Sequence, residues 1–581
     1  MRPCPRVPAT RRSPAHVALP PAASAVARLP GRSRTRLAAA VAWSLASAAA
    51  FADPRPASAP QAGALREQVL RYTSARASTF FDVTTDGAQL LIGARFGDTL
   101  QLASVAAPMG MRSQETFAEA PIASARFLPQ DPDTLLYLHD PFGNQNYQIY
   151  KLERAGALTT LLSDGQTRHT DLLLSRDGRR LAWAGNARPG PESDVYAAAT
   201  DAPEAPRRHT ELAGRWRPLD FSANGQALLL LRQRAPGDDE LWTAAVDGSV
   251  QKKLWPPEGA AGIADARYSA DGHQLFLISD FFSDAQELAL LDLDHPERPA
   301  RRLTAELKWD VDALACAQDR GAPAAAAIAV NQGGYDRLYL LEPGTLRLMP
   351  VSLPSGLVTA LRFPTVKSDV LLLGLESPTR PGEIEQLDVR TRRLVRWTRA
   401  ELGPLEPAAL LEPTRASWSS DGLAIPTLVY RPRVETGARL PVLLVLHAGP
   451  RSLARPGFDA LAQLAASGLG VAVLAPSLRG AEALGKALRG DPDPARLLQQ
   501  RIRDLSAGLD WIQRQPDLDP GRVVLLDEAP QSGLAAAFEL AHPKQLRAVL
   551  GADLRDREAS RSAQREALAK LLLLLKANLS P

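Results

Sequence analysis

Cysteine is almost absent from this chain: only Cys4 and Cys316 occur among 581 residues. Because Cys4 lies in a segment with the features of a cleaved leader, one cysteine remains, and it cannot form an internal disulfide. This excludes a disulfide-rich domain. Cys316 stands in the apolar stretch 314–317 and is predicted to be a core residue. The sequence also lacks zinc-ligand spacing and a glycine-rich phosphate loop, so we expect neither a metal nor a cofactor.

Acidic residues are missing from the first 52 positions, which hold eight arginines. Without this segment, 60 basic residues face 64 acidic ones, and the formal net charge changes from +4 to −4. The basic character of the chain therefore belongs to its N-terminus. It does not predict a basic surface on the folded part, and we expect no nucleic-acid partner.

The N-terminus also lacks an apolar run of transmembrane length. Three arginines precede the run 37–50, which ends in the small-x-small pattern Ala50-Phe51-Ala52. This layout is typical of a signal peptide, which we predict over residues 1–52; an uncleaved anchor is the alternative. The run holds 14 residues, whereas a membrane-spanning helix needs about 20. An exported chain without disulfides fits the bacterial periplasm or secretion, with no stable membrane span after cleavage.

A tight-turn signal recurs every 44 to 50 residues after the leader, and a short apolar run follows most of its copies. Aspartate or asparagine before glycine favours a tight turn, because both residues tolerate positive φ. The marks are Asp86-Gly87, Asp131-Pro132-Asp133, Asp177-Gly178, Asn224-Gly225, Asp271-Gly272, Asp319-Arg320-Gly321 and Ser368-Asp369.

One turn and about four strands in each repeat are typical of a propeller blade. We therefore predict a β-propeller of about seven blades over residues 65–410. A β-solenoid or an array of sandwiches is the alternative. The repeat is too long for a hexapeptide-type β-helix, and the turns recur too regularly for unrelated sandwiches. The turn residues resemble those of TolB-type and prolyl-oligopeptidase propellers and have a structural role.

The pattern changes near residue 415. Buried strands now alternate with helices, which predicts a mainly parallel, doubly wound sheet in a second domain over residues 415–581. A hairpin at 417–432 leads into it. The expected strands are 440–446, 471–475, 522–526 and 546–550, and the expected helices are 458–467, 495–513 and 533–541.

Several motifs in this second domain occur in the order found in prolyl-oligopeptidase-type (S9) serine peptidases. They are His447-Ala448-Gly449-Pro450, the segment 475–480 that contains Arg479, the helix residues Asp504 and Trp511, the strand entry Asp519–Val523, and His542-Pro543. The chain therefore resembles that family, closely over 410–555 and at the level of architecture over 65–410. The resemblance implies a β-propeller followed by an α/β-hydrolase domain. It places His447 and Gly449 in the oxyanion region.

In an α/β-hydrolase the nucleophilic serine occupies a sharp strand-to-helix turn, Gly-x-Ser-x-Gly. Counting forward from Arg522 and backward from His542 puts this position at 529, which is Ala529. Asp527 and Gln531 replace the two glycines. Pro530 lacks the backbone N–H that would help to stabilise the oxyanion. Alanine has no nucleophilic atom, so no catalytic residue is retained at this turn.

The histidine base and its carboxylate partner are also not found. His447 resembles the oxyanion-strand histidine, and His542 is expected to close a helix away from the site. Ser532 is a weak candidate nucleophile without a base. Asp527 and Glu528 are weak candidates for a carboxylate nucleophile, with no histidine to activate water; the simpler interpretation is that they cap the following helix.

These features predict a degenerate peptidase, a pseudoenzyme that binds a peptide or protein in the cavity between propeller and hydrolase. One alternative is an active peptidase or esterase whose true C-terminus, with the missing Asp and His, is lost through a frameshift. Another is a TolB-like propeller that acts as an interaction module. The hydrolase half is interpreted as shortened after the fourth parallel strand, which would expose a sheet edge. Residues 556–578, with the apolar patch Leu568 and Leu571–Leu575, are expected to cover this edge or to join a homodimer.

Overall fold

The computed structural model describes residues 59–188, 190–319, 321–433, 437, 439–447, 453–481, 485–529, 532–551 and 560–579. The predicted signal peptide, 1–52, lies outside these residues. So do Gly449, Pro530 and Gln531 of the predicted site.

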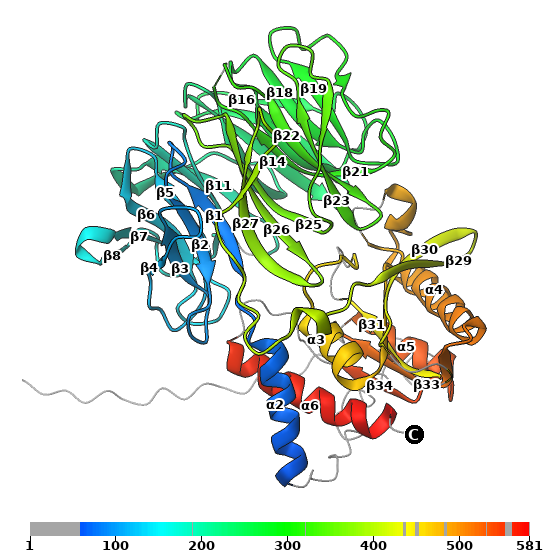
Figure 1. Ribbon diagram of the computed structural model, residues 1–581. Coiled ribbons are helices and arrows are strands. Elements are labelled where there is room, and N and C mark those ends of the chain that lie inside the picture. The colour runs from blue at the N-terminus through cyan, green and yellow to red at the C-terminus, as the bar shows by residue number, and fades with distance from the viewer. Residues whose placement is uncertain are drawn as a thin grey trace, which may run out of the picture. The chain divides into compact units, whose positions relative to one another are not determined.

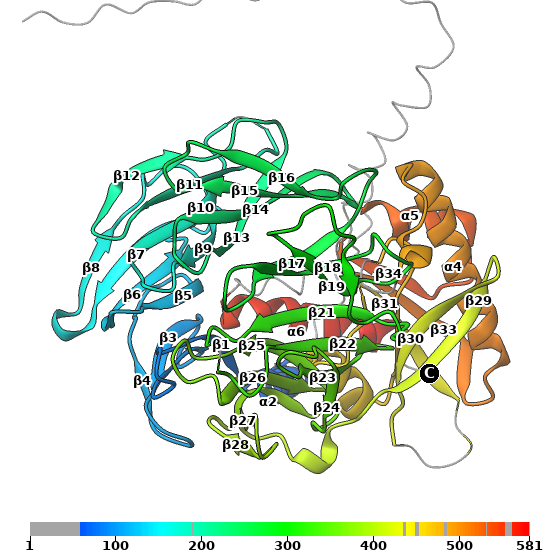
Figure 2. The ribbon, with the colours of Figure 1, turned by 90° about the horizontal axis from the view of Figure 1, so that it is seen from above.

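Within the described residues, seven four-stranded antiparallel sheets follow one another along the chain (Figures 1 and 2). This arrangement confirms the propeller and its seven blades. The first four blades are β1 (Ser78–Val83), β2 (Leu90–Ala94), β3 (Gln101–Val105), β4 (Arg112–Gln114); β5 (Ile122–Leu128), β6 (Asp131–His139), β7 (Gln148–Glu153), β8 (Leu158–Leu161); β9 (His169–Leu174), β10 (Arg180–Gly185), β11 (Asp194–Ala199), β12 (Ala202–Arg208); and β13 (Arg215–Phe221), β14 (Ala227–Ala235), β15 (Asp238–Ala245), β16 (Gln251–Trp255). The last three are β17 (Ile263–Tyr268), β18 (Gln274–Ser279), β19 (Glu287–Asp292), β20 (Arg301–Arg302); β21 (Asp310–Cys316), β22 (Ala326–Gln332), β23 (Tyr335–Leu341), β24 (Leu348–Val351); and β25 (Leu357–Arg362), β26 (Val370–Ser377), β27 (Arg380–Asp388), β28 (Leu394–Arg396).

The recurring turn joins the first and second strands of a blade. In blade 3, Ser175 Oγ donates to Asp177 Oδ1 at 2.6 Å and accepts from Arg180 N at 3.0 Å, while Gly178 has φ of 65°. Only the glycine uses positive φ. Asp177 does not adopt the positive φ that it tolerates; its carboxylate acts as a local hydrogen-bond acceptor.

The ring closes by packing and not by a strand shared between the first and last blades. Each sheet contains only its own four consecutive strands, and β1 lies against β25 and β27. An isolated antiparallel bridge joins Arg76, just before blade 1, to Glu401, just after blade 7. The sequence placed the start of the propeller near residue 65, but its first strand begins at Ser78.

The second domain contains a six-stranded sheet in the order β29-β30-β32-β31-β33-β34. The pairs β29–β30 and β30–β32 are antiparallel, and the other three pairs are parallel. This is the expected α/β-hydrolase arrangement. Its strands are β29 (Thr414–Ser420), β30 (Leu423–Tyr430), β31 (Leu440–Leu446), β32 (Ala472–Pro476), β33 (Leu518–Asp527) and β34 (Ala548–Gly551). Its helices are α3 (Ala460–Gln463), which continues as a π-helical turn at Leu464–Gly468, α4 (Pro494–Arg514), α5 (Leu534–Ala541) and α6 (Arg561–Leu579). Short 3₁₀ turns lie at Arg154–Gly156, Pro407–Ala409 and Lys486–Arg489.

Both faces of this sheet are buried, which explains the continuous apolar run of β31. Leu443 and Val445 pack in a cluster with α3 and α6, whereas Val442 and Leu444 pack in another cluster with α4 and α5. Since side chains alternate along a strand, a strand covered by helices on both faces is apolar at every position.

Helix α6 covers a face of the sheet and not its edge, which differs from the expectation. Leu568, Leu572 and Leu575 are buried in the same cluster as β33 residues and an N-terminal helix, α2 (Ala59–Thr73). The sequence did not predict α2. Figure 1 shows α2 and α6 beside each other below the propeller.

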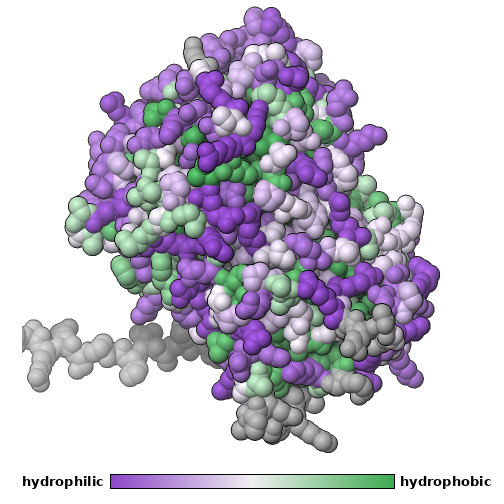
Figure 3. All heavy atoms as spheres, viewed as in Figure 1, coloured by the Kyte–Doolittle hydropathy of each residue, from purple (hydrophilic) through white to green (hydrophobic). Residues whose placement is uncertain are grey.

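The surface facing the viewer in Figure 3 is mainly hydrophilic, with apolar side chains scattered between polar ones. Among the described residues, no helix is both long and apolar enough to span a membrane.

Candidate functional site

Ala529 lies in the bend between β33 and α5, where the sequence placed it. β33 ends at Asp527 and α5 begins at Leu534. Ala529 is half-buried, and its carbonyl accepts a hydrogen bond from Ser532 N at 2.9 Å. A methyl group therefore stands at the bend that the sequence predicts as the nucleophile position.

Asp527 is buried and contacts the bend and the start of the helix. Its Oδ1 accepts a hydrogen bond from Ala529 N at 2.8 Å. Burial raises the pKa of this carboxyl, although backbone hydrogen bonds from Ala529 and Ala535 and the charge of Arg501 oppose the effect. The other oxygen, Oδ2, is buried without a hydrogen-bond partner, and the capping role of Asp527 stays a prediction.

Glu528 points elsewhere, toward the end of the neighbouring strand. Its Oε2 lies 3.2 Å from His447 Nδ1, and the side chains of Glu528 and His447 are only 2% and 5% exposed. Its backbone N–H donates to Leu446 O at 3.0 Å, which continues the pairing of β31 with β33. The sequence interpretation put no histidine beside these acids, and the structure corrects that: His447 contacts Glu528.

This contact follows from topology. β31 and β33 are adjacent parallel strands, so the residues directly after them lie at the same edge of the sheet. The sequence signal was therefore present, since His447 and Glu528 each follow a predicted buried strand. The contact could be inferred from this signal only with the knowledge that β31 and β33 are neighbours in the sheet.

Ser532 and His542 lie at opposite ends of α5. Ser532 is exposed, and its Oγ accepts from Leu534 N at 3.3 Å, as at a helix start. His542 Nε2 lies 2.7 Å from Ser506 Oγ of α4, and this hydroxyl is also 2.7 Å from Ile502 O. Eight helical residues separate Ser532 from His542, about 12 Å along the axis. Ser532 therefore cannot use His542 as a base.

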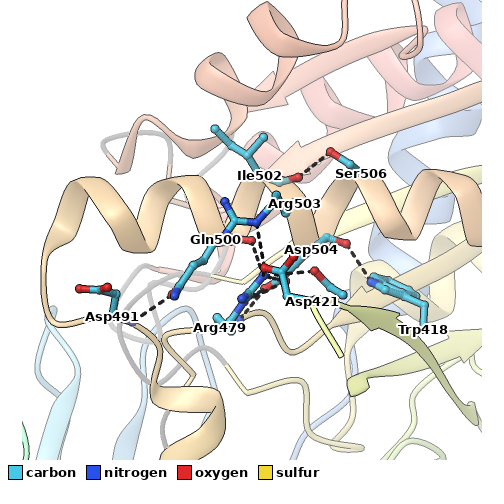
Figure 4. A network of polar contacts seen from close by, with 10 residues as sticks. Trp418, Asp421, Arg479, Asp491, Gln500, Ile502, Arg503, Asp504 and Ser506 are labelled. Atoms are coloured by element: carbon cyan, nitrogen blue, oxygen red, sulfur yellow. Dashed lines mark hydrogen bonds and ion pairs between the residues drawn. The ribbon is translucent and has the colours of Figure 1, made fainter. Parts of the chain in front are cut away.

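Arg479 and Asp504 form a buried ion pair (Figure 4). Arg479 Nη2 lies 2.6 Å from Asp504 Oδ1, with the two side chains 7% and 0% exposed. Arg479 also bonds Ser420 Oγ at 3.1 Å and lies 2.9 Å from Asp421 Oδ2. Trp418 Nε1 donates to Asp504 O at 2.8 Å. These motif residues thus join the β29–β30 hairpin, the segment after β32 and helix α4.

The bend between β33 and α5 therefore combines a methyl group, two buried carboxylates with local partners and one exposed hydroxyl. Among the described residues of this bend, no serine, threonine or cysteine side chain contacts an imidazole. Searched over the described residues, the structure contains no group of three or more histidine, cysteine, aspartate or glutamate side chains arranged to hold a metal ion.

No family model and no curated protein matches this sequence. Solved structures do resemble it. A prolyl endopeptidase structure is 14% identical and matches with a TM-score of 0.72 over 94% of this chain and 83% of its own. Puromycin hydrolase is 20% identical, with a TM-score of 0.66 over 79% of this chain and 75% of its own.

Prolyl oligopeptidase B from Galerina marginata, solved with a 35mer hydrolysis and macrocyclization substrate, is 16% identical. Its TM-score is 0.70 over 85% of this chain and 75% of its own. Matches of this extent include both the blades and the hydrolase sheet. The chain therefore has the fold of the prolyl oligopeptidases, a seven-bladed β-propeller with an α/β-hydrolase domain.

Proposed function

We propose that this chain is a peptide- or protein-binding scaffold without hydrolytic activity. The observation that carries the proposal is Ala529, whose methyl group occupies the bend between β33 and α5. Covalent catalysis by a hydrolase of this fold needs a nucleophile at that bend, together with a base that accepts its proton.

The neighbouring side chains do not supply a substitute. Glu528 is buried against His447, so its carboxylate is engaged and has no open approach. Asp527 is buried, and its Oδ1 is bonded to Ala529 N. A carboxylate nucleophile would also need a free base to activate water for the second step. The geometry thus supports binding more than catalysis.

A fluorophosphonate probe tests the catalytic half of the proposal. We expect no covalent mass increase on the purified full-length chain under conditions that fully label an active prolyl endopeptidase. Hydrolysis of a mixed peptide pool, followed by mass spectrometry, should show no new cleavage. Stoichiometric labelling, or cleavage that survives further purification, would refute the scaffold.

Peptide binding is tested separately, by photo-crosslinking of a diverse peptide library to the full-length chain. The peptide-bearing fold of the prolyl oligopeptidase B structure supports this half. Crosslinks to both domains are expected for a ligand held between them. Crosslinks confined to the blades would favour the propeller interaction module instead, and saturating peptide without any specific crosslink would contradict binding.

Export to the periplasm is a further part of the proposal, and it rests on residues 1–52 with their arginines and the apolar run 37–50. Fractionation of expressing bacteria and N-terminal sequencing of the mature chain test it. A mature N-terminus at Asp53 is expected, and an intact chain in the cytoplasm would contradict it.

A further inference from the structure

Each of the seven blades has a residue at the same position near the end of its first strand. This residue stands two positions before the start of the turn that joins the first and second strands. In blades 1, 2, 4, 5 and 7 this residue is charged, and in blades 3 and 6 it is apolar. In blade order the residues are Asp82, Arg126, Leu173, Asp220, Arg267, Ala315 and Arg362. All of them line one cavity of about 640 Å³ at the centre of the ring, where the first strands gather (Figure 2).

Aspartates and arginines at this position make a repeated contact between neighbouring blades. Asp82 Oδ2 accepts from Phe127 N at 2.9 Å, and Arg126 donates to Phe81 O at 3.0 Å. Blades 4 and 5 repeat this arrangement with Asp220 and Arg267. The carboxylates of this ring are therefore largely satisfied by backbone N–H groups. Asp82 also pairs with Arg362 at 2.8 Å.

Two further arginines enter the same cavity, Arg176 and Arg217. Arg176 follows β9 of blade 3 and reaches past blade 4 to the carbonyls of Ser269 and Ala270 in blade 5, at 3.4 and 3.3 Å. Its Nε is buried without a hydrogen-bond partner. Arg217 donates to Ala264 O at 3.0 Å.

Three of these guanidinium groups form no salt bridge among the described residues, although Asp82, Asp86, Asp133, Asp171 and Asp220 also line the cavity. Among the described residues, neither Arg126, Arg176 nor Arg217 has a carboxylate within salt-bridge distance, and the bonds found for them go to carbonyl oxygens. A guanidinium has five N–H donors, so carbonyl contacts leave donors unused on each. Burial, together with the charges of Arg362 and Arg267, lowers the pKa of Arg126 to about 10, against the opposing effect of Asp82. Arg126 thus lies near two other positive charges as well as near Asp82.

The cavity lies at the end of the ring that is far from the hydrolase domain. Strand β21 shows this, because Asp310 at its start accepts a hydrogen bond from Gly485 N of the hydrolase domain, whereas Cys316 at its end lines the cavity. Six residue steps along the extended strand separate these two positions by about 20 Å. Cys316 is half-buried there and packs against the core cluster of blades 5 and 6, in keeping with the expected core position.

We propose that this ring of arginines is a binding site for the carboxylate groups of an acidic peptide. Arginine recognises carboxylates through paired N–H donors, and such charge-assisted bonds are stronger than neutral ones. A carboxylate between Arg126 and Arg176 would relieve the repulsion that the like charges create. The inference goes beyond the proposed function, because this site lies in the propeller alone and not between the two domains; its test can fail without that function failing.

The competing explanation is that the arginines only connect neighbouring blades through hydrogen bonds to backbone carbonyls. Titration calorimetry on the full-length chain separates the two. One probe is an acetylated, amidated hexapeptide of alternating glutamate and glycine, and the other is its uncharged glutamine counterpart. We expect the glutamate peptide to bind more tightly and to lose affinity as salt is raised, because salt screens the attraction.

Arg126→Gln and Arg176→Gln should each weaken the glutamate peptide about tenfold, the loss expected for one charge-assisted hydrogen bond. Arg179→Gln is the matched control: it removes the same charge from the same turn as Arg176, but its side chain is 81% exposed and outside the cavity lining. Thermal unfolding of each variant shows whether it is folded. The salt dependence of the wild-type chain needs no variant.

Equal binding of the two peptides would overturn the carboxylate site and leave peptide binding in place. An equal loss with Arg179→Gln would overturn it as well, since the effect would then be one of overall charge. If neither hexapeptide binds, the arginines serve only to connect neighbouring blades, and the crosslinking experiment still decides whether other peptides bind.

Discussion

Replacing Asp504 by asparagine removes the negative charge from the buried pair with Arg479 and keeps the shape of the side chain. Asp504 is fully buried, and Arg479 bonds it through Nε and Nη2 at 2.6 to 3.1 Å. Removing one partner of such a pair leaves an uncompensated buried charge and costs about 3–5 kcal/mol. Asp421, at 2.9 Å from Arg479, remains as a second carboxylate. We therefore expect a loss near the lower limit, about 3 kcal/mol.

Hydrogen exchange measured by mass spectrometry reports this loss in the hydrolase domain alone, which matters because a two-domain chain need not unfold in one step. Amides of α4 and β33 should exchange faster in Asp504→Asn, while those of the blades should not change. Asp421→Asn is the matched control. Asp421 is 42% exposed, and exposed ion pairs contribute at most about 1 kcal/mol. If both variants raise exchange equally, the buried pair does not have the role assigned to it.

The other predictions concern the bend, a propeller carboxyl and the tail helix. Ala529→Ser should not react with a fluorophosphonate probe, because His447 is held by Glu528 and no other imidazole of the described residues lies at the bend; labelling of this variant would show that a base is present. Burial raises the pKa of Asp239 to about 6, so its ionisation destabilises the fold as the pH rises from about 4 to above 6. At pH 7.5 the free energy of unfolding of Asp239→Asn, measured by denaturant titration, should exceed that of wild type by no more than about 3 kcal/mol. At pH 4 the two should be equal. Leu572→Ala should cost about 2–5 kcal/mol by leaving a cavity between α6 and the sheet, seen as faster hydrogen exchange in α2 and α6; unchanged exchange there would contradict the packing.

Much of the fold follows from local patterns. The blade turns are visible because serine, aspartate and glycine are needed within four residues to make one hydrogen-bonded turn, as at Ser175–Gly178. Strand β31 is visible because a strand buried on both faces is apolar throughout. Ala529 could be located because the motifs before β33 and after α5 fix the bend between them from both sides.

Contacts between distant segments could not be read in this way. Helix α2 precedes the propeller in sequence but packs with α6, nearly 500 residues later, so no local pattern reveals its partner. The contact between His447 and Glu528 depends on which strands are neighbours. The arginines of the central cavity are spread over separate blades, and each looks like an ordinary surface arginine until the ring is closed.

The two domains differ in what their unusual residues can do. In the hydrolase domain, Arg479, Asp504 and His447 belong to the motifs that resemble those of the peptidases. Their contacts connect strands and helices, which is a structural role that does not depend on catalysis. In the propeller, Arg126 and Arg176 keep donors and positive charge that the fold itself does not use. These half-buried charges have carbonyl partners but no salt bridge, and a ligand carboxylate would supply one. For this reason the search for the ligand should start with the propeller cavity and not with the bend at Ala529.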